Sequence, residues 1–335
     1  MTINYIILAH KHPGQLRRLI EKLSDSDCFF YVHIDKGRAI EPFLSETAEF
    51  DNIYFASAEQ REYGTWGDIG IVRATLNLVE QILSDGRNGY CILLSGQDYP
   101  VTNVSIIRSY LLENSGSVFM SYFPIPSADW CAGGIERISQ YKFNISNRRG
   151  DFVLCPSVSQ KDFYSIQTIK KVFKLLIRRK IRFLLMLLKR RPGFPAYLMP
   201  FGGDQWWSMP TDIAKEIIGF LHEHPDYLEF HEHTLLPDEI FFQSIILHLN
   251  QVSPLKIKPT LTYINWQRKN VPLPVTFTEH DREELTNLPI GKFFARKFDM
   301  DIDNNILDTL DEVIASNSHQ KSDRPVKNTI MEKTE

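Results

Sequence analysis

The stretch Ile3-Asn4-Tyr5-Ile6-Ile7-Leu8-Ala9 decides the fold class of this chain. An almost continuous apolar run of this length is typical of a β-strand that is buried on both faces. His12-Pro13-Gly14 then leads into a predicted helix with apolar residues at helical spacing from Leu16 to Leu23. A doubly buried strand needs helices on both sides, so this beginning predicts an α/β fold.

The same pattern repeats through the first third of the chain. We predict further strands at Phe29 to Ile34, Asn52 to Ala56, Gly89 to Leu94 and Ser117 to Phe123, and helices at Trp66 to Leu83, Asp212 to Glu223 and Ile306 to Ile314. Repeated strand–helix–strand units predict a mainly parallel sheet flanked by helices. Polar clusters follow three of the strands: Ala9-His10-Lys11, His33-Ile34-Asp35-Lys36 and Ser95-Gly96-Gln97-Asp98. Ligands bind outside the carboxyl ends of such strands, so we expect the site there.

A second informative stretch, Pro237-Asp238-Glu239-Ile240-Phe241-Phe242-Gln243, places two acids at the start of an apolar run with helical spacing. We therefore expect Asp238 and Glu239 in the first turn of a buried helix, beside the positive end of its dipole. Two interpretations follow. Both acids cap the helix, or one of them, held rigidly and partly desolvated, acts as a general base.

The composition is that of an ordinary globular protein: 335 residues, 43% apolar and 24% charged. A formal net charge of -3 argues against general nucleic-acid binding. The four cysteines are scattered without a CxxC pair, which fits a reducing compartment. The chain enters its first strand without a basic leader, and no uncharged apolar run reaches about eighteen residues. We expect a cytoplasmic protein, or a peripheral one at the inner face of the cytoplasmic membrane.

The segment from Lys170 to Arg191 is rich in lysine and arginine, contains no acid, and interleaves these charges with apolar residues. We predict one inserted basic amphipathic helix at about 166–192. Such a helix can lie in a membrane interface and attract anionic lipid, or it can pack on the body with a solvated basic face. Nucleic acid fits less well, because the helix is strongly apolar and the whole chain is slightly acidic.

Seven segments, in this order, resemble the Core-2/I-branching glycosyltransferase family, which includes the peptide O-xylosyltransferases. They are Ala9-His10-Lys11, Val32-His33-Ile34-Asp35-Lys36, Tyr63-Gly64-Thr65-Trp66-Gly67, Leu94-Ser95-Gly96-Gln97-Asp98-Tyr99-Pro100, Gly202-Gly203-Asp204-Gln205-Trp206-Trp207, Leu236-Pro237-Asp238-Glu239-Ile240-Phe241-Phe242 and Phe294-Ala295-Arg296-Lys297-Phe298-Asp299. The resemblance runs from Tyr5 to about Asp303. It implies a GT-A-type fold, a UDP-sugar donor, inversion of the anomeric centre, and no divalent metal or other cofactor.

The resemblance also implies a division of the chain. We expect one domain over 1–315, with a nucleotide-binding half at about 1–125 and an acceptor-binding, catalytic half at about 126–315. The polar, lysine-rich end from 316 to 335 offers little to bury and is predicted to be disordered.

A leaving diphosphate needs positive charge, which GT-A enzymes usually take from a metal on an Asp-x-Asp motif. The nearest match here, Asp299-Met300-Asp301, lies near the C-terminus, where we expect solvated carboxylates. Arg296 and Lys297 offer a guanidinium fork and an ammonium instead, and the resemblance implies the same role. The alternative is a solvated basic turn. Arg268 is a weaker candidate for a further cation.

Inversion is a single displacement, so one base must deprotonate the acceptor hydroxyl. Glu239 matches the catalytic glutamate of the family, which leaves Asp238 to cap the helix. We expect Asp204, Gln205, Trp206 and Trp207 to line the sugar and acceptor site, unless the tryptophans are core residues. His10, Lys11, Asp35 and Gly64 are expected around uridine and ribose, and Asp98 near the diphosphate or donor sugar.

The histidines in His222-Glu223-His224 and His231-Glu232-His233 do not predict a zinc site, because alternate positions do not share one face of a helix. The expected absence of a membrane anchor and of disulfide-forming cysteines distinguishes the chain from the animal enzymes and suits a bacterial cytosolic one. A surface-polysaccharide intermediate on a polyprenyl-diphosphate carrier is then the expected acceptor. N-acetylglucosamine is the first expectation for the donor sugar, and xylose is the second.

Two other classes of protein stay open. A nucleotide- or carbohydrate-binding protein that has lost catalysis needs no base, so Glu239 and the Arg296-Lys297 pair together argue against this class. A glycoside hydrolase would use two carboxylates and release free sugar without UDP.

Overall fold

The computed structural model describes residues 1–146 and 148–320 and confirms the predicted α/β class. Its central sheet has seven strands in the order β12 (Lys256–Lys258), β6 (Ser117–Met120), β11 (Trp207–Pro210), β4 (Tyr90–Ser95), β1 (Ile3–Ala9), β2 (Cys28–Ile34) and β3 (Ile53–Phe55). β1 pairs in parallel with β2 and β4, and only β11 runs antiparallel to its neighbours within this sheet. The sheet is therefore mainly parallel, as the sequence predicts.

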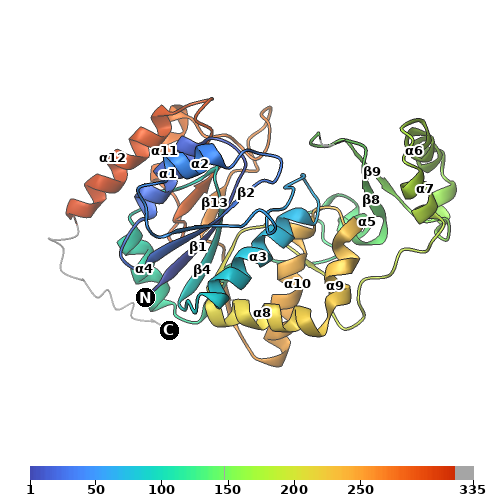
Figure 1. Cartoon of the computed structure of the whole chain (residues 1–335), viewed down its shortest axis with the longest axis horizontal. Helices are drawn as coiled ribbons and strands as arrows, with labels where there is room; N and C mark the ends of the chain where they lie inside the picture. Colours follow the sequence, from blue (N-terminus) through green and yellow to red (C-terminus); the bar gives the residue numbers. More distant parts are fainter. Residues whose placement is uncertain (147, 321–335) are drawn as a thin grey trace, which may run out of the picture.

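Helices cover both faces of this sheet (Figure 1). The odd-numbered residues of β1 pack in one apolar cluster with α1 (Pro13–Leu23), α4 (Val104–Glu113) and α12 (Asn305–Gln320). Ile6, on the opposite face, packs in a second cluster with α3 (Gly70–Ser84), α8 (Thr211–Glu223) and α10 (Phe241–Val252). Alternate side chains of a strand point to opposite faces, so the apolar run of β1 supplies both layers of the core.

The carboxyl ends of β1, β2, β4 and β6 lie at one edge of the sheet, and the antiparallel β11 begins there. A second sheet has three strands, β13 (Thr262–Ile264), β14 (Phe294–Arg296) and β5 (Asp98–Pro100). It lies at this edge because β5 follows shortly after the end of β4. The segments that follow β1, β2 and β4 thereby meet the segments that precede β11 and follow β14.

Four elements within residues 141–187 form a lobe at the end of the molecule away from α12 (Figure 1). They are β8 (Tyr141–Asn144), β9 (Phe152–Cys155), α6 (Ile166–Ile177) and α7 (Ile181–Leu187). The lobe has an apolar cluster of its own, which includes Leu175 of α6 and Leu187 of α7. The remaining short elements are α2 (Glu41–Glu46), β7 (Phe123–Pro124), α5 (Ile135–Ser139), β10 (Phe201–Gly202), α9 (Pro225–Phe230) and α11 (Arg282–Thr286).

The prediction of a single basic helix at 166–192 is wrong, because the segment folds into two helices. Arg179 has a left-handed backbone, with φ of 54°. The amides of Arg179 and Lys180 donate to the carbonyls of Leu176 and Leu175, both at 2.9 Å, which closes the end of α6. α7 then folds back along α6 and brings its own apolar residues to the same cluster.

The two acids at 238 and 239 do not lie in the first turn of α10, contrary to the prediction. They occupy a separate 3₁₀ turn, Pro237–Glu239, and α10 begins only at Phe241. Between the two, Ile240 has φ of -130°, which is not helical, and its side chain is fully buried against Ile125 and Ile138. Burial of Ile240 in this small cluster separates the acids from the helix.

Three other boundaries differ from the prediction. α3 begins at Gly70 and not at Trp66, since Gly67 has φ of 72°. The strand expected at Ser117 to Phe123 ends at Met120 in the central sheet. α12 continues to Gln320, so the expected disordered tail begins too early, and its part at 321–335 lies outside the described residues. Among the helices that are described, none is both long and apolar enough to cross a bilayer.

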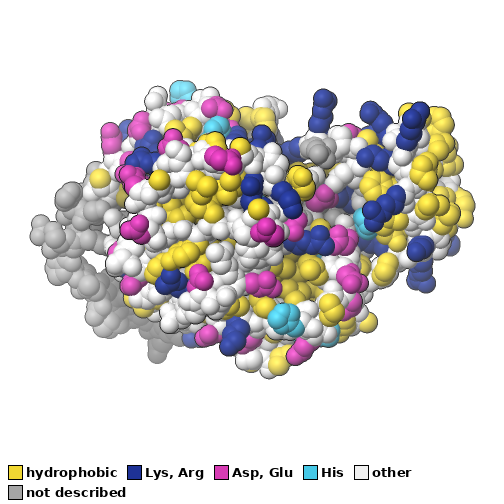
Figure 2. Space-filling model, in the orientation of Figure 1, with side chains coloured by type: hydrophobic (Ala, Val, Ile, Leu, Met, Phe, Trp, Pro, Cys, Tyr) yellow, Lys and Arg dark blue, Asp and Glu magenta, His cyan; other side chains and the backbone are white. Residues whose placement is uncertain are grey.

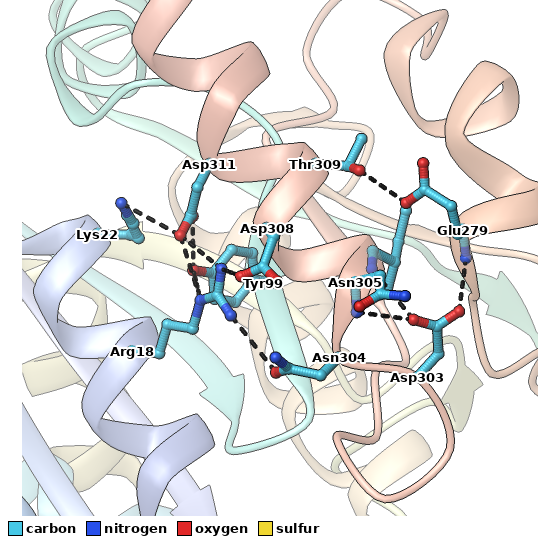
Figure 3. Close-up of polar contacts among 11 residues, drawn as sticks. Arg18, Lys22, Tyr99, Glu279, Asp303, Asn304, Asn305, Asp308, Thr309 and Asp311 are labelled. Atoms are coloured by element: carbon cyan, nitrogen blue, oxygen red, sulfur yellow. Dashed lines mark hydrogen bonds and ion pairs between the residues drawn. The ribbon is translucent and has the colours of Figure 1, made fainter.

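Polar contacts hold α12 against the body of the protein (Figure 3). Arg18 of α1 donates to Asp308 at 2.6 Å and to Asp311 at 2.7 Å, and the Tyr99 hydroxyl donates to Asp311 at 2.8 Å. At the start of the helix, the Asp303 carboxylate accepts from the Asn305 amide at 2.8 Å. The C-terminal helix is thus joined to both the first helix and the strand that follows β4.

Arg18→Ala should lower the stability of the protein by about 1–3 kcal/mol, because it leaves the largely buried Asp311 with a weaker set of partners. Chemical unfolding monitored by circular dichroism measures the change. Arg17→Ala is the matched control: Arg17 pairs with Glu49 on the open surface, and its loss should leave the midpoint unchanged. Equal effects of the two variants would contradict this account of α12.

Candidate active site

A cavity of about 620 Å³ opens at the edge where the parallel strands end. Most of the residues that the sequence predicts for the site line it: His10, Asp35, Gly64, Asp204, Gln205, Trp206, Glu239, Arg296 and Lys297. In Figure 2, basic and acidic side chains gather between the body and the lobe. The cavity draws on both predicted halves of the chain, so neither half forms the site alone.

Asp35, directly after β2, is held by backbone amides. Its two carboxylate oxygens accept from the amide of Gly37 at 2.8 Å and from that of Gly64 at 2.6 Å. A Cβ at position 64 would lie 2.9 Å from the Asp35 carboxylate oxygen, so a larger residue there would displace this carboxylate. The Asp35 carboxylate therefore has a fixed position on the cavity wall, and a fixed carboxylate suits recognition of a pair of hydroxyl groups.

Histidines line the same wall. Burial lowers the pKa of His33 to about 4, and its Nε2 accepts from the Glu62 amide at 2.8 Å. Burial, assisted by nearby Lys11 and Arg38, also lowers the pKa of His10. Both rings are therefore neutral at physiological pH, and both residues line the cavity.

Arg296 is held in place by a buried acid. β14 pairs with β5 so that Arg296 lies opposite Asp98, and its Nη1 donates to Asp98 at 2.8 Å and to the Ser95 hydroxyl at 2.6 Å. The guanidinium carbon lies 4.3 Å from the centre of the Trp206 ring. Burial raises the pKa of Asp98, although Arg296 opposes this shift. Asp98 does not line the cavity, and its effect on a ligand would pass through Arg296.

Lys297 lies among other cations. Burial lowers the pKa of Lys297, and Arg149, Arg296 and Lys11 lower it further. Like charges held this close repel one another until an anion neutralises them. The cavity wall formed by Arg149, Arg296 and Lys297 is therefore a natural binding site for a multiply charged anion such as a diphosphate.

Three expected residues have other partners. Lys11 is bonded to Asp299 and does not line the cavity. Trp207 is 2% exposed and packs on Phe242 in the core, because it lies on β11 while Trp206 precedes the strand. Arg268 pairs with Asp281 at 2.6 Å and with Glu284 at 2.7 Å, which leaves it committed away from the cavity.

Within the described part of the chain, one group of side chains could hold a metal ion. The ligand atoms of His12, Asp299 and Asp301 lie within 4.8 Å of one another. These residues are not part of the cavity lining, and the Asp299 carboxylate also pairs with Lys11. The Asp-x-Asp match is thus partly buried at Asp299, whereas the sequence predicts solvated carboxylates.

Glu239 presents a carboxylate to the cavity and pairs with Arg137 of α5. Arg137 Nη1 donates to Glu239 Oε2 at 2.6 Å, and its guanidinium carbon lies 3.5 Å from the centre of the Trp130 ring. Burial raises the pKa of Glu239, Arg137 opposes the shift, and Asp204 supports it. The Glu239 side chain is 24% exposed, so it remains accessible from the cavity.

The strand–turn segment before β11 holds the second acid of this region. The Ser121 hydroxyl donates to Asp204 Oδ2 at 2.8 Å, and the Gln243 side chain donates to the Asp204 carbonyl at 2.6 Å. The Gly203 amide donates to the Glu239 carbonyl at 3.0 Å. A Cβ at position 203 would lie 2.1 Å from the Ser121 carbonyl oxygen, so only glycine lets these segments meet.

Asp238 lines the cavity but does not cap a helix, contrary to the prediction. Its Oδ1 has no hydrogen-bond partner among the described residues, and the N-terminus of α10 takes no side-chain cap. Burial, followed by the neighbouring Glu239, raises the pKa of Asp238 to about 7. Its buried surroundings and the neighbouring Glu239 disfavour the ionised carboxylate.

Sequence reasoning missed Arg137 and Arg149, because neither lies in a recognisable motif. The fold brings Arg149 to the cavity lining and sets Arg137 of the short helix α5 behind Glu239. Ser121 lies in the predicted strand Ser117 to Phe123, and no sequence pattern identifies it as the hydrogen-bond partner of Asp204.

Asp238→Asn should make stability less dependent on pH. The pKa of Asp238 is about 7 in the folded protein and about 4 in an unfolded chain. Between these values the folded state retains a proton that the unfolded state loses, so wild-type stability falls as the pH rises from about 4 to about 7. Asparagine cannot ionise, so the melting temperature of the variant should exceed that of the wild type by a margin that grows over this range. A margin independent of pH would contradict the assignment.

Comparison with known proteins identifies the family. The family model of the Core-2/I-branching enzyme matches residues 3–288. The chain is 23% identical to xylosyltransferase 2 of Rattus norvegicus over 333 residues, which cover 93% of this chain and 33% of that protein. It is also 23% identical to a xylosyltransferase of Ciona intestinalis over 330 residues, covering 93% of this chain and 34% of that protein. The chain thus spans about a third of the length of these relatives.

A solved structure of mouse xyloside xylosyltransferase 1 in its apo form is 10% identical and superimposes with a TM-score of 0.34, covering 88% of this chain and 97% of that one. The family match extends over most of the chain and includes the segments that build the cavity as far as Pro274. By this match, the chain belongs to the Core-2/I-branching enzyme family.

Proposed function

We propose that this protein is an inverting glycosyltransferase that moves a sugar from a UDP-sugar to a hydroxyl group of a glycan acceptor. One observation carries the proposal. A single cavity brings together a carboxylate with a raised pKa, Glu239, and the cationic wall of Arg149, Arg296 and Lys297. A glycosyl transfer from a nucleotide needs a base for the acceptor and positive charge for the departing diphosphate.

In this proposal the donor lies along the edge of the sheet. Asp35 takes the ribose hydroxyls, with His10 and Gly64 beside the uridine. The diphosphate contacts Arg296, whose fork Asp98 and Ser95 fix, and Lys297. These cations neutralise the developing charge, so no divalent metal and no other cofactor is required. The cluster of His12, Asp299 and Asp301 is the competing candidate, since it could hold a metal.

On the acceptor side, Glu239 removes the proton of the acceptor hydroxyl. The hydroxyl oxygen forms a bond to the anomeric carbon while the bond from that carbon to the diphosphate oxygen breaks, and UDP leaves with the electron pair. The raised pKa of Glu239 makes it a stronger base than a solvated glutamate. Asp204, Gln205 and Trp206 line the space where the two sugars meet.

The finer assignments follow from chemistry and family. N-acetylglucosamine is the first candidate for the donor sugar, and xylose is the second, which the xylosyltransferases among the relatives support. We place the protein in the cytoplasm, acting on a lipid-linked intermediate of a surface polysaccharide, in contact with a membrane through residues 170–191. The principal alternative is a nucleotide- or carbohydrate-binding protein without catalysis.

The first test is the release of UDP from a panel of UDP-sugars by the purified protein, with and without EDTA. Turnover of one donor should persist in EDTA, and Lys297→Ala should weaken UDP binding and slow turnover by about tenfold or more. Lys269→Ala, which changes an exposed lysine, should leave both unchanged. Loss of turnover in EDTA would show that a metal ion, and not Lys297, stabilises the leaving diphosphate. Absence of both turnover and UDP binding would favour the binding-protein alternative.

Glu239→Gln should lower the rate of transfer by about 10²-fold or more while UDP affinity stays near that of the wild type, because the amide cannot accept the proton. Initial rates and calorimetric titration with UDP separate the two effects. The control, Glu223→Gln, changes an exposed glutamate on α8 and should retain full activity. A fully active Glu239→Gln enzyme would show that another group is the base.

A further inference from the structure

The two helices α6 and α7, called here the α6–α7 hairpin, carry a second apolar face that nothing among the described residues covers. The inner face packs in the apolar cluster of the lobe through Leu175 and Leu187, which are 0% and 2% exposed. The outer face exposes large side chains, between 57% and 74% each: Ile166, Ile169, Phe173, Ile177, Leu185 and Leu188. Soluble monomers rarely expose so many apolar groups on one face, and such a face is typical of an interaction surface.

Positive charge surrounds the outer face. Lys170, Arg178, Arg182 and Lys189 are exposed on the hairpin, while residues 163–203 include no aspartate or glutamate. The whole chain carries a formal charge of -3, so the positive charge is local to this end of the molecule. Figure 2 shows the same end with apolar side chains and lysine and arginine gathered together.

Exposed apolar side chains together with positive charge distinguish between the possible partners of this face. A second copy would bring two basic hairpins together, which costs electrostatic energy. A nucleic acid would match the charge but leave the apolar side chains in water. An anionic lipid surface matches both, because acyl chains accept the apolar groups and headgroups pair with lysine and arginine.

We propose that the α6–α7 hairpin inserts its outer apolar face into an anionic lipid bilayer and docks the protein on the membrane without spanning it. The lobe transmits this placement to the cavity. Lys142 and Asn144 of β8 both bond Asp68, next to the cavity rim, and Arg149 of the turn that joins β8 to β9 lines the cavity. Docking of the hairpin therefore fixes the distance between the cavity and the lipid surface. This part rests on the proposed function, in which a lipid-linked acceptor must reach Glu239 from the bilayer.

The test is flotation of the full chain with two kinds of vesicle, phosphatidylcholine alone and phosphatidylcholine mixed with phosphatidylglycerol. The wild type should float with the mixed vesicles and much less with the neutral ones. Ile177→Ser combined with Leu185→Ser should reduce the bound fraction by about tenfold or more. Arg178→Gln combined with Arg182→Gln should remove the preference for anionic lipid.

The matched control is Leu112→Ser combined with Val252→Ser, which changes two exposed apolar residues on α4 and α10 of the body. This control should float like the wild type. Failure of the wild type to bind either vesicle, equal losses in hairpin and control variants, or a concentration-dependent dimer that only the hairpin variants abolish would each overturn the proposal.

Calorimetric titration with UDP provides the separate readout, because the outer face is remote from the cavity lining. All variants should bind UDP like the wild type. Vesicle binding without UDP binding would overturn the proposed glycosyl transfer and leave the docking surface intact. UDP binding without vesicle binding would overturn the docking surface and leave the proposed glycosyl transfer intact.

Discussion

Strands that lie side by side and run in the same direction must end at the same edge, and the rest of this molecule depends on that geometry. Because β1 is buried on both faces, it pairs with β2 and β4 in the middle of the sheet and fixes where the segments after them emerge. Those segments carry Asp35 and Gln97, which lie far apart in the sequence but share one cavity. β11 runs the other way, and so the residues before it, including Asp204, arrive at the same edge.

At this edge, charged side chains are removed from water and depend on one another. Arg296 keeps its orientation through Asp98, and Glu239 through Arg137. Buried pairs of this kind cost desolvation energy and contribute little to net stability, but each defines the direction of a side chain closely. Among the described residues, Lys297 and Asp238 have no such ion-pair partner, and burial lowers the pKa of Lys297 and raises that of Asp238. An anion bound beside Lys297 would supply the missing partner and favour its charged form.

The sequence was sufficient for the parts of the molecule that periodicity and strand ends determine. β1, β2 and β4 lie within a residue of their predicted positions, and the polar groups after them meet as expected. Prediction failed where tertiary packing overrides the local pattern. Burial of Ile240 detaches Glu239 from α10, the left-handed Arg179 splits the basic segment, and Trp207 faces the core because β11 begins one residue after Trp206. Arg137 had no local pattern that could reveal it.

The lobe has a consequence for how proteins built on this plan can diverge. Its apolar cluster is separate from the two clusters of the body, and it meets the body through a limited set of contacts, such as the pairing of Lys142 with Asp68 and the packing of Phe152 on Trp66. Substitutions inside the lobe therefore leave the sheet and its strand ends undisturbed. Replacement of the lobe during evolution would therefore keep the strand ends in place, and within the cavity it would alter the part of the cationic wall that Arg149 supplies.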